Sequence, residues 1–187
     1  MDLQLGVDIL SSFLPSEFIP RTGAIFSSDR KYRYVLWRIW NSERPKVLFI
    51  MLNPSIADEV RDDPTQRRCR RYAQRWGFGG YYVGNIFAIV STDPSRLKEV
   101  DDPVGTENNS YLQKLHTESA STVIAWGTWG NLHGRNIEVL SLLKKIKPVK
   151  CLGLCMDGNP KHPLYLKVGL VPMEYEMVEK VGIKISA

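Results

Sequence analysis

Polar side chains suited to hydrolysis follow the first and the last of four apolar segments. Asn53 and Pro54 come directly after residues 46–52, and His162 lies in a proline-rich turn beyond residues 149–154. An asparagine amide has no useful basicity but can position a water molecule, whereas a histidine can donate a hydrogen bond to an oxygen that gains negative charge. Each dipeptide alone is an ordinary turn or surface loop. Their value as a catalytic pair therefore depends on the elements that bring them together.

Those elements alternate along the chain. Short segments rich in β-branched and aromatic residues predict four core strands, at 46–52, 81–89, 122–127 and 149–154. Segments with helical spacing lie between them, at 64–76, 106–118 and 131–147. The alternation predicts one three-layer α/β/α domain over residues 1–187, with a central, mainly parallel, four-stranded sheet. Because ligands bind beyond the carboxyl ends of parallel strands, we expect the residues after each strand to form the site.

The residues before the first core strand have a different pattern. The first two dozen residues predict a short helix and a loop, interrupted by Pro15 and Pro20. Residues 24–40 alternate apolar and polar side chains around a turn-like SSDR, which predicts an N-terminal β-hairpin at one edge of the sheet. We expect its arginines and tyrosines to face solvent.

Composition excludes several classes of protein. No apolar run approaches the roughly 20 residues that span a bilayer, and the acidic N-terminus lacks the basic region of a signal peptide. We therefore expect a cytoplasmic protein without membrane contact, acting as a monomer. Three cysteines without a CxxC pair support neither disulfides nor a zinc or iron–sulfur site. No metal and no cofactor are expected.

The positive charge of the chain is concentrated in one segment. The net charge is +5, and residues 61–75 contain six arginines against two aspartates. Such a segment, which includes Arg67 and Arg68, is suited to phosphate contacts, although a solvated helix face is an equally good interpretation. Asp62 and Asp63 directly precede the helix expected at 64–76 and are expected to cap it.

The segments after the strands resemble those of the uracil-DNA glycosylase superfamily, over about residues 46–168. LNPS is similar to the motif that ends the superfamily's first strand, which puts Asn53 at the water-activating position. His162-Pro163 stands where the superfamily has its catalytic histidine. AWGTWGNLHG is similar to the stretch in which a hydroxyl residue, here Thr128, approaches the DNA backbone. Asn85 corresponds to an asparagine that reads the base in many members.

A narrower resemblance covers more of the sequence. The strings LNPS, DDPTQRRC, WGFGG, GNIFA, DPVG, AWG and HPLYL are similar to a bacterial and phage family catalogued as domain of unknown function 1643. That family assigns no activity. The functional expectation therefore comes from the glycosylase resemblance and from the chemistry of the residues.

The glycosylase resemblance implies an N-glycosyl hydrolase whose partner is double-stranded DNA, possibly modified phage DNA, and which flips a base out of the duplex. His162 would stabilise the departing base and Asn53 would hold the attacking water. Asn85, Ser55 and Phe87 would contact the base, although a buried asparagine can equally cap backbone groups and a phenylalanine normally packs in the core. The residues that would contact DNA are Arg67, Arg68, Thr128, Lys161, Leu164 and Tyr165. The HPLYL segment is also expected to pack against the sheet, so that at least one of its large side chains is buried and does not contact DNA.

Ser55 stands where the uracil-specific branch has a bulky tyrosine that rejects 5-substituted pyrimidines. A more open pocket is expected, so the resemblance implies a modified, 5-substituted pyrimidine or uracil as the substrate base, in repair or anti-phage defence. The main alternative is a non-catalytic nucleic-acid-binding module with a glycosylase-like fold. A small-molecule nucleotide hydrolase is a third interpretation, but the sequence has no GxxxxGK[ST] phosphate loop to support it.

Overall fold

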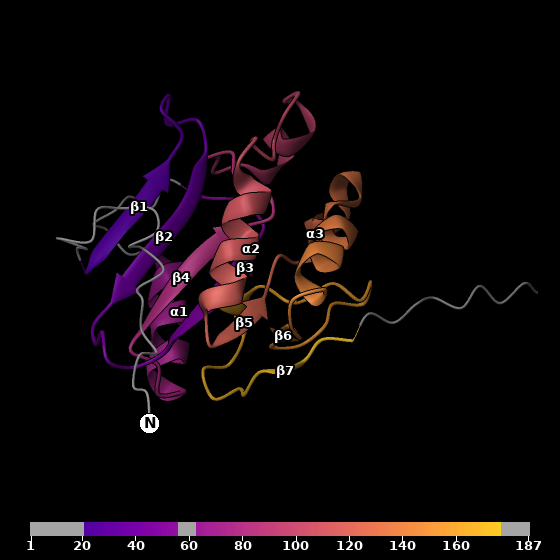
Figure 1. Ribbon diagram of the computed structural model, residues 1–187. Helices are drawn as coiled ribbons and strands as arrows, with labels where there is room; N and C mark the ends of the chain where they lie inside the picture. The colour runs from indigo at the N-terminus through magenta and orange to yellow at the C-terminus, as the bar shows by residue number, and fades with distance from the viewer. Residues whose placement is uncertain (1–20, 56–62, 177–187) are drawn as a thin grey trace, which may run out of the picture.

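A single mixed sheet runs through the computed structural model, which describes residues 21–55 and 63–176. Figure 1 shows this sheet with helices on both of its sides. In the described residues the sheet has seven strands, in the order β1-β2-β4-β3-β5-β6-β7. Their bounds are β1 Thr22–Phe26, β2 Arg33–Ile39, β3 Lys46–Met51, β4 Gly80–Asn85, β5 Ser121–Ile124, β6 Lys150–Cys151 and β7 Met173–Glu174. The helix expected near the N-terminus lies outside the described residues.

The four strands predicted from the apolar segments are present, but the sheet is larger than predicted. β4, β3, β5 and β6 are parallel to one another, as expected. The predicted hairpin forms from β1 and β2, and β2 pairs antiparallel with β4. β7 adds an antiparallel strand beside β6. The predicted number of strands was too low because the hairpin extends the sheet instead of only covering its edge, and because β7 adds a further strand.

The position of β2 inside the sheet overturns one expectation about its side chains. Arg33, Tyr34 and Arg38 are at most 4% exposed, whereas the alternating pattern predicted solvent-facing arginines and tyrosines. β2 has β1 along one edge and β4 along the other, and all of its residues are buried. This burial matters for function, since Arg33 lines the cavity described below.

The three predicted helices form close to their expected bounds. They are α1 Pro64–Arg75, α2 Asn108–Glu118 and α3 Arg135–Lys144, joined by the short 3₁₀ helices η2 Pro94–Lys98, η3 Thr128–Gly134 and η4 Pro163–Tyr165. α3 begins later than predicted because the backbone leaves helical geometry at Leu132 and His133. The Asp63 carboxylate caps α1, accepting a hydrogen bond from the N–H of Gln66 at 2.7 Å, as predicted. Asp62 lies outside the described residues.

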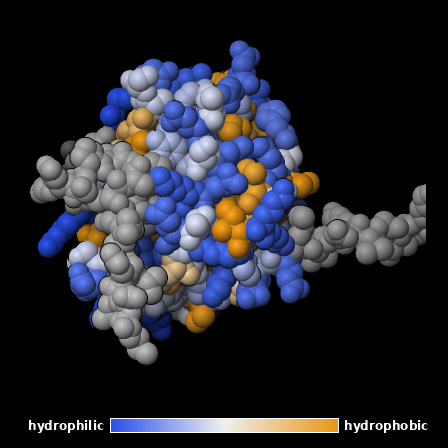
Figure 2. All heavy atoms as spheres, viewed as in Figure 1, coloured by the Kyte–Doolittle hydropathy of each residue, from blue (hydrophilic) through white to orange (hydrophobic). Residues whose placement is uncertain are grey.

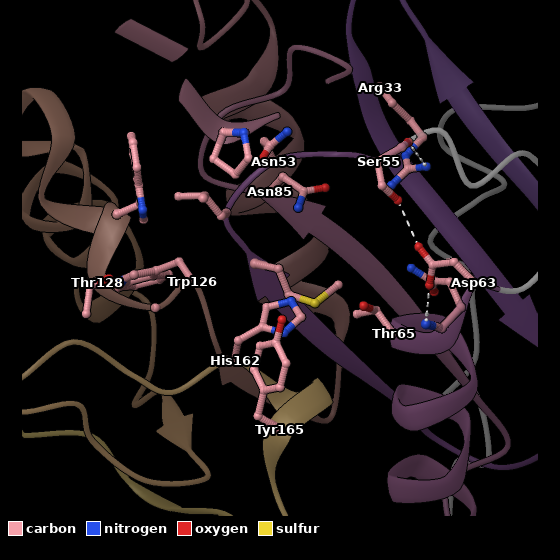
Figure 3. A pocket seen from close by; sticks show the side chains of 16 residues that line it. Arg33, Asn53, Ser55, Asp63, Thr65, Asn85, Trp126, Thr128, His162 and Tyr165 are labelled. Atoms are coloured by element: carbon pink, nitrogen blue, oxygen red, sulfur yellow. Dashed lines mark hydrogen bonds between the residues drawn. The ribbon is translucent and has the colours of Figure 1, made fainter. Parts of the chain in front are cut away.

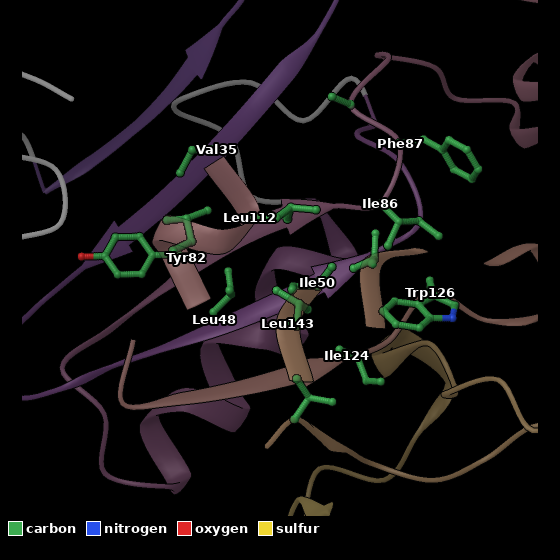
Figure 4. Close-up of a cluster of buried hydrophobic side chains, with 14 of the residues drawn as sticks. Val35, Leu48, Ile50, Tyr82, Ile86, Phe87, Leu112, Ile124, Trp126 and Leu143 are labelled. Atoms are coloured by element: carbon green, nitrogen blue, oxygen red, sulfur yellow. The ribbon is translucent and has the colours of Figure 1, made fainter. Parts of the chain in front are cut away.

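Alternate residues of the strands pack against different helices. On β3, Leu48 and Ile50 belong to the hydrophobic cluster beneath α2 and α3, whereas Phe49 and Met51 belong to the cluster beneath α1. Figure 4 shows the first of these clusters, with Leu112 of α2 and Leu143 of α3 over the sheet. The two faces make three layers, which confirms the predicted α/β/α class.

Glycine at position 84 lets α2 approach the sheet closely. A Cβ atom there would lie 2.6 Å from the Cδ2 atom of Leu112. The adjacent Asn85 ends β4 directly beside Met51 of β3. Parallel pairing therefore brings the segments that follow these two strands to the same edge of the sheet, where Ile86 donates a backbone hydrogen bond to Met51 at 2.9 Å.

The surface shown in Figure 2 is mainly hydrophilic, with hydrophobic residues in small, separate groups. No helix within residues 21–55 and 63–176 has the length and hydropathy to cross a bilayer. Surface hydrophobic residues scattered in this way are ordinary. This face therefore offers no large apolar docking area.

Candidate functional site

A cavity of about 350 Å³ opens at the carboxyl edge of the parallel strands. This size lies in the usual range for small-ligand pockets. Its walls come from the segments after β3, β4, β5 and β6, from the start of α1 and from β2. The lining residues are Arg33, Met51, Leu52, Asn53, Ser55, Asp63, Thr65, Gln66, Asn85, Pro94, Trp126, Gly127, Thr128, Trp129, His162 and Tyr165. Figure 3 shows Trp126 and Thr128 on one side and Ser55 and Asp63 on the other.

The side chain of Asn53 is oriented by the backbone of a neighbouring loop. Its Nδ2 atom donates to the carbonyl of Ser91 at 2.7 Å and to that of Pro54 at 3.2 Å. Among the residues that the structure describes, the Oδ1 atom makes no hydrogen bond. Asn53 therefore offers a fixed acceptor to a water molecule or to an N–H group in the cavity.

His162 presents a defined nitrogen to the same cavity. Its Nδ1 atom accepts a hydrogen bond from the N–H of Leu164 at 3.4 Å, which caps η4. In a neutral imidazole the proton then sits on Nε2, leaving this atom as the donor. Burial lowers the pKa of His162 below its ordinary value, and the carboxylate of Asp63 opposes this shift. Neutral His162 is thus a hydrogen-bond donor that carries no charge.

Two buried amides in the cavity have polar atoms without partners. Asn85 is 2% exposed, and its side-chain amide makes no hydrogen bond within the described part of the chain. Gln66 is equally buried, and its Oε1 atom has no hydrogen-bond partner there. Leaving buried donors and acceptors unsatisfied costs about 1–3 kcal/mol each. The Asn85 amide is therefore suited to a ligand that supplies complementary hydrogen bonds, whereas the Oε1 atom of Gln66 is itself buried and is not accessible from the cavity.

The wall opposite Trp126 carries a buried ionic group. Ser55 Oγ donates to Asp63 Oδ2 at 2.8 Å, and the guanidinium of Arg33 lies 3.5 Å from the backbone oxygen of Ser55. Burial lowers the pKa of Arg33 to about 10, and the negative charge of Asp63 counteracts the effect. Arg33 consequently keeps its positive charge at neutral pH. Figure 3 shows these three residues together.

Trp126 forms an apolar wall that a hydrogen-bond network holds in place. Its Nε1–H donates to Asn159 Oδ1 at 3.0 Å, and Asn159 Nδ2 donates to Asn131 Oδ1 at 2.8 Å. A Cβ atom at Gly130 would lie 2.0 Å from the indole Cδ1 atom. Gly127, at φ 75°, starts the turn and donates to the carbonyl of Pro160 at 2.8 Å. The loops after β5 and β6 are therefore joined around the tryptophan.

Most of the residues predicted for the site line this cavity. They are Asn53, Ser55, Asn85, Thr128, His162 and Tyr165. Sequence reasoning missed Arg33, Gln66 and Trp126. Trp126 lay inside the predicted third strand, 122–127, so the rule that selected Thr128 passed over it; in the structure β5 ends at Ile124 and Trp126 follows the strand. Arg33 had no such signal, since its position depends on pairing between β2 and the distant β4.

Other predicted residues lie elsewhere. Phe87 is fully buried in the core beneath α2 and α3 and is not among the cavity residues (Figure 4), which favours the packing interpretation. Arg67 and Lys161 are exposed, whereas Arg68 and Leu164 are half-buried. Tyr165 is 84% exposed at the mouth of the cavity. Leu166 packs against the cluster beneath α1, so the HPLYL segment contributes to the core as expected.

The cavity has no evident set of metal ligands. Within the described ranges, no three His, Cys, Asp or Glu side chains are grouped so as to hold a metal ion. The chemistry available in the cavity is that of amides, hydroxyls, one imidazole, one guanidinium and one carboxylate. Such groups can bind and orient a polar planar ligand and can donate to a developing anion.

The architecture defines an α/β protein with a cavity at the carboxyl edge of its sheet. The chain belongs to the family described as Protein of unknown function (DUF1643), whose model matches residues 33–164. This match confirms the narrower of the two resemblances seen in the sequence. It includes β2 as well as the four parallel strands, and it ends at Leu164 beside His162. No curated protein and no solved structure matches the chain significantly.

Proposed function

We propose that this protein is a DNA glycosylase with a site similar to that of the uracil-DNA glycosylases. The observation that carries the proposal is the buried amide of Asn85, which makes no hydrogen bond within the described residues and lines the cavity that also contains His162. A pyrimidine has an amide-like edge with adjacent donors and acceptors, which such side chains can read. The flat indole of Trp126 provides a wall on which the ring can stack.

In the proposed reaction a water molecule held by Asn53 Oδ1 attacks the sugar C1′ atom. The bond between C1′ and the base nitrogen breaks, and its electron pair leaves with the base. The Nε2–H of His162 donates a hydrogen bond to the base oxygen as negative charge develops there. The water proton passes to solvent and the base anion takes up a proton. The products are an abasic sugar and the free base.

The favoured substrate is a 5-substituted pyrimidine, with uracil as a smaller substrate. Ser55 is small, and its hydroxyl donates to Asp63 instead of projecting a ring into the cavity. A pocket without a bulky side chain at position 55 favours a role in repair of modified bases or in defence against phage DNA that carries them.

DNA contacts are proposed around the mouth of the cavity. Tyr165 is highly exposed there and is suited to fill the space left by a flipped base. Thr128 and Lys161 are exposed on the loops beside it, and Arg67 is exposed in the first half of α1. Arg68 and Leu164 are accessible enough to contribute. The cationic side chains among them, Lys161, Arg67 and Arg68, are suited to contacts with phosphates.

The second candidate is a nucleic-acid-binding module that performs no chemistry, since the same amides would also bind a base without cleaving it. The two are distinguished by comparing His162→Ala with wild type on duplex DNA carrying one 5-substituted uracil. A glycosylase predicts release slowed about 100-fold or more, as for loss of one oxyanion donor, with binding within about threefold. His133→Asn is the matched control, because His133 is exposed and its φ of 54° suits asparagine. A wild-type protein that binds this DNA but releases no base would support the binding module.

A further inference from the structure

A second hollow adjoins the proposed base pocket. It has a volume of about 330 Å³ and is lined by Lys98, Thr128, Trp129, Asn131 and Leu132. Thr128 and Trp129 also line the main cavity, so the two hollows share a wall. A ligand that leaves the main cavity past Thr128 therefore reaches Trp129 next.

Trp129 is a large aromatic side chain that the core does not use. It is 38% exposed and belongs to neither hydrophobic cluster. Its loop is nevertheless held in place, since the N–H of Gly127 donates a hydrogen bond to the carbonyl of Pro160 and Gly130 packs closely against the buried Trp126. An indole held at the surface on a fixed turn is a preformed platform, and ordering it costs little on binding.

The positively charged side chain of Lys98 lies over this indole. The Nζ atom of Lys98, from η2, lies 4.8 Å from the centroid of the Trp129 ring. Lys98 is exposed, so its flexible side chain can move from the ring to an anion without losing a buried partner. An aromatic ring for stacking beside a lysine for phosphate is the combination that binds single-stranded nucleic acid.

We propose that Trp129 and Lys98 form a subsite for the nucleotide next to the flipped one, in a strand that is unpaired at this position. The base of that nucleotide stacks on the indole and its phosphate pairs with Lys98. A base that stacks on Trp129 cannot remain stacked in a duplex, so occupancy of this subsite requires the strand to be unpaired or locally melted beside the flipped nucleotide. This proposal rests on the proposed function, because that function identifies the main cavity as the pocket for the flipped base. The test of the subsite measures DNA binding and does not depend on base release.

The test measures binding of a labelled single-stranded oligonucleotide of about 12 nucleotides, and of its duplex, by fluorescence anisotropy. Trp129→Ala is expected to weaken single-strand binding about 5- to 150-fold and duplex binding much less. Trp129→Phe keeps an aromatic face and should remain within about threefold of wild type. Ile137→Ala, at an exposed site on α3, is the control for loss of a surface hydrophobic side chain.

The charge component is tested with Lys98→Gln. This variant should reduce the slope of log binding constant against log salt concentration by about 0.7, the value for one phosphate of a single strand. Lys145→Gln removes the same charge from an exposed site at the end of α3 and should leave the slope unchanged. Unchanged single-strand affinity for Trp129→Ala, or equal losses on single strand and duplex, would overturn the subsite.

The outcomes separate this proposal from the glycosylase proposal. If no DNA yields a free base but Trp129→Ala loses single-strand affinity, the subsite is supported and the glycosylase proposal is contradicted. If bases are released while Trp129→Ala and Lys98→Gln bind single strands like wild type, the glycosylase proposal is supported and the subsite is contradicted.

Discussion

The backbone N–H of Leu164 donates to Nδ1 of His162 at 3.4 Å, which leaves Nε2 as the proton-bearing nitrogen of the neutral imidazole. The cap of a short 3₁₀ helix thus sets the tautomer of the proposed catalytic residue. Both partners lie at the end of the segment that follows β6. The function of His162 depends on this neutral form, and several expected outcomes follow from it and from the cavity around it.

The rate of base release should keep more than half of its value as the pH is lowered from 8 to about 6.5, the ordinary histidine value. Burial lowers the pKa of His162, so less than half of the folded enzyme is protonated at that pH. The rate is then lost as the pH falls through the lowered pKa, if neutral His162 is the active form. Single-turnover rates across this range provide the check. A rate that is already halved at pH 6.5 or above would contradict the assignment.

Replacing Ser55 with tyrosine should narrow the substrate range. A ring at this position would fill the space near Asp63, so release of 5-substituted pyrimidines should fall about 10- to 200-fold relative to uracil. Ser55→Ala is the control, because it removes the 2.8 Å hydrogen bond to Asp63 without adding volume. The ratio of kcat/KM for the two bases is the quantity to compare. An unchanged ratio in the tyrosine variant would show that position 55 does not limit the substrate.

Replacing Asn85 with alanine should weaken recognition of the base. If its amide makes two hydrogen bonds to the substrate, kcat/KM should fall by the equivalent of about 1–3 kcal/mol. Because the free side chain has no partner in the described structure, the folded protein should lose little stability. Steady-state kinetics and chemical unfolding are measured together, with Asn41→Ala at an exposed site as the control. Strong destabilisation with normal kinetics would indicate that Asn85 is purely structural.

Gly130→Ala should displace Trp126 and disturb the cavity. The added methyl group would lie 2.0 Å from the indole, and overpacking of this kind costs about 1–3 kcal/mol. We expect a lower free energy of unfolding together with weaker base release. Gly169→Ala is the matched control, since nothing lies within 4 Å of its Cβ position. Equal stability of the two variants would argue against the proposed bracing of Trp126.

The alternation of apolar and helical segments was sufficient to predict the parallel strands and the helices. It also predicted where the cavity opens, since Asn53, Asn85, Thr128 and His162 all follow strands or end them. This success has a physical cause: parallel strands with crossover helices place their carboxyl ends at one edge.

The remaining features depend on contacts between distant parts of the chain. Arg33 was expected at the surface because the local pattern of β2 does not reveal that β4 will pair with it. Phe87 lies two residues beyond Asn85, which ends β4, yet it belongs to the core beneath α2 and α3. Gln66 became a cavity residue only because the cap at Asp63 places the start of α1 beside the end of β3. Sequence periodicity contains none of these distances.

The central claim is tested most directly by mass spectrometry of free bases released from DNA. The wild-type protein and an Asn53→Ala, His162→Ala double variant are incubated with unmodified, uracil-containing and 5-substituted pyrimidine DNA. The proposed function predicts that wild type releases a 5-substituted pyrimidine, and uracil more weakly, while the double variant releases neither. Absence of any free base from every DNA with the folded wild-type protein, or equal release by the double variant, would contradict it.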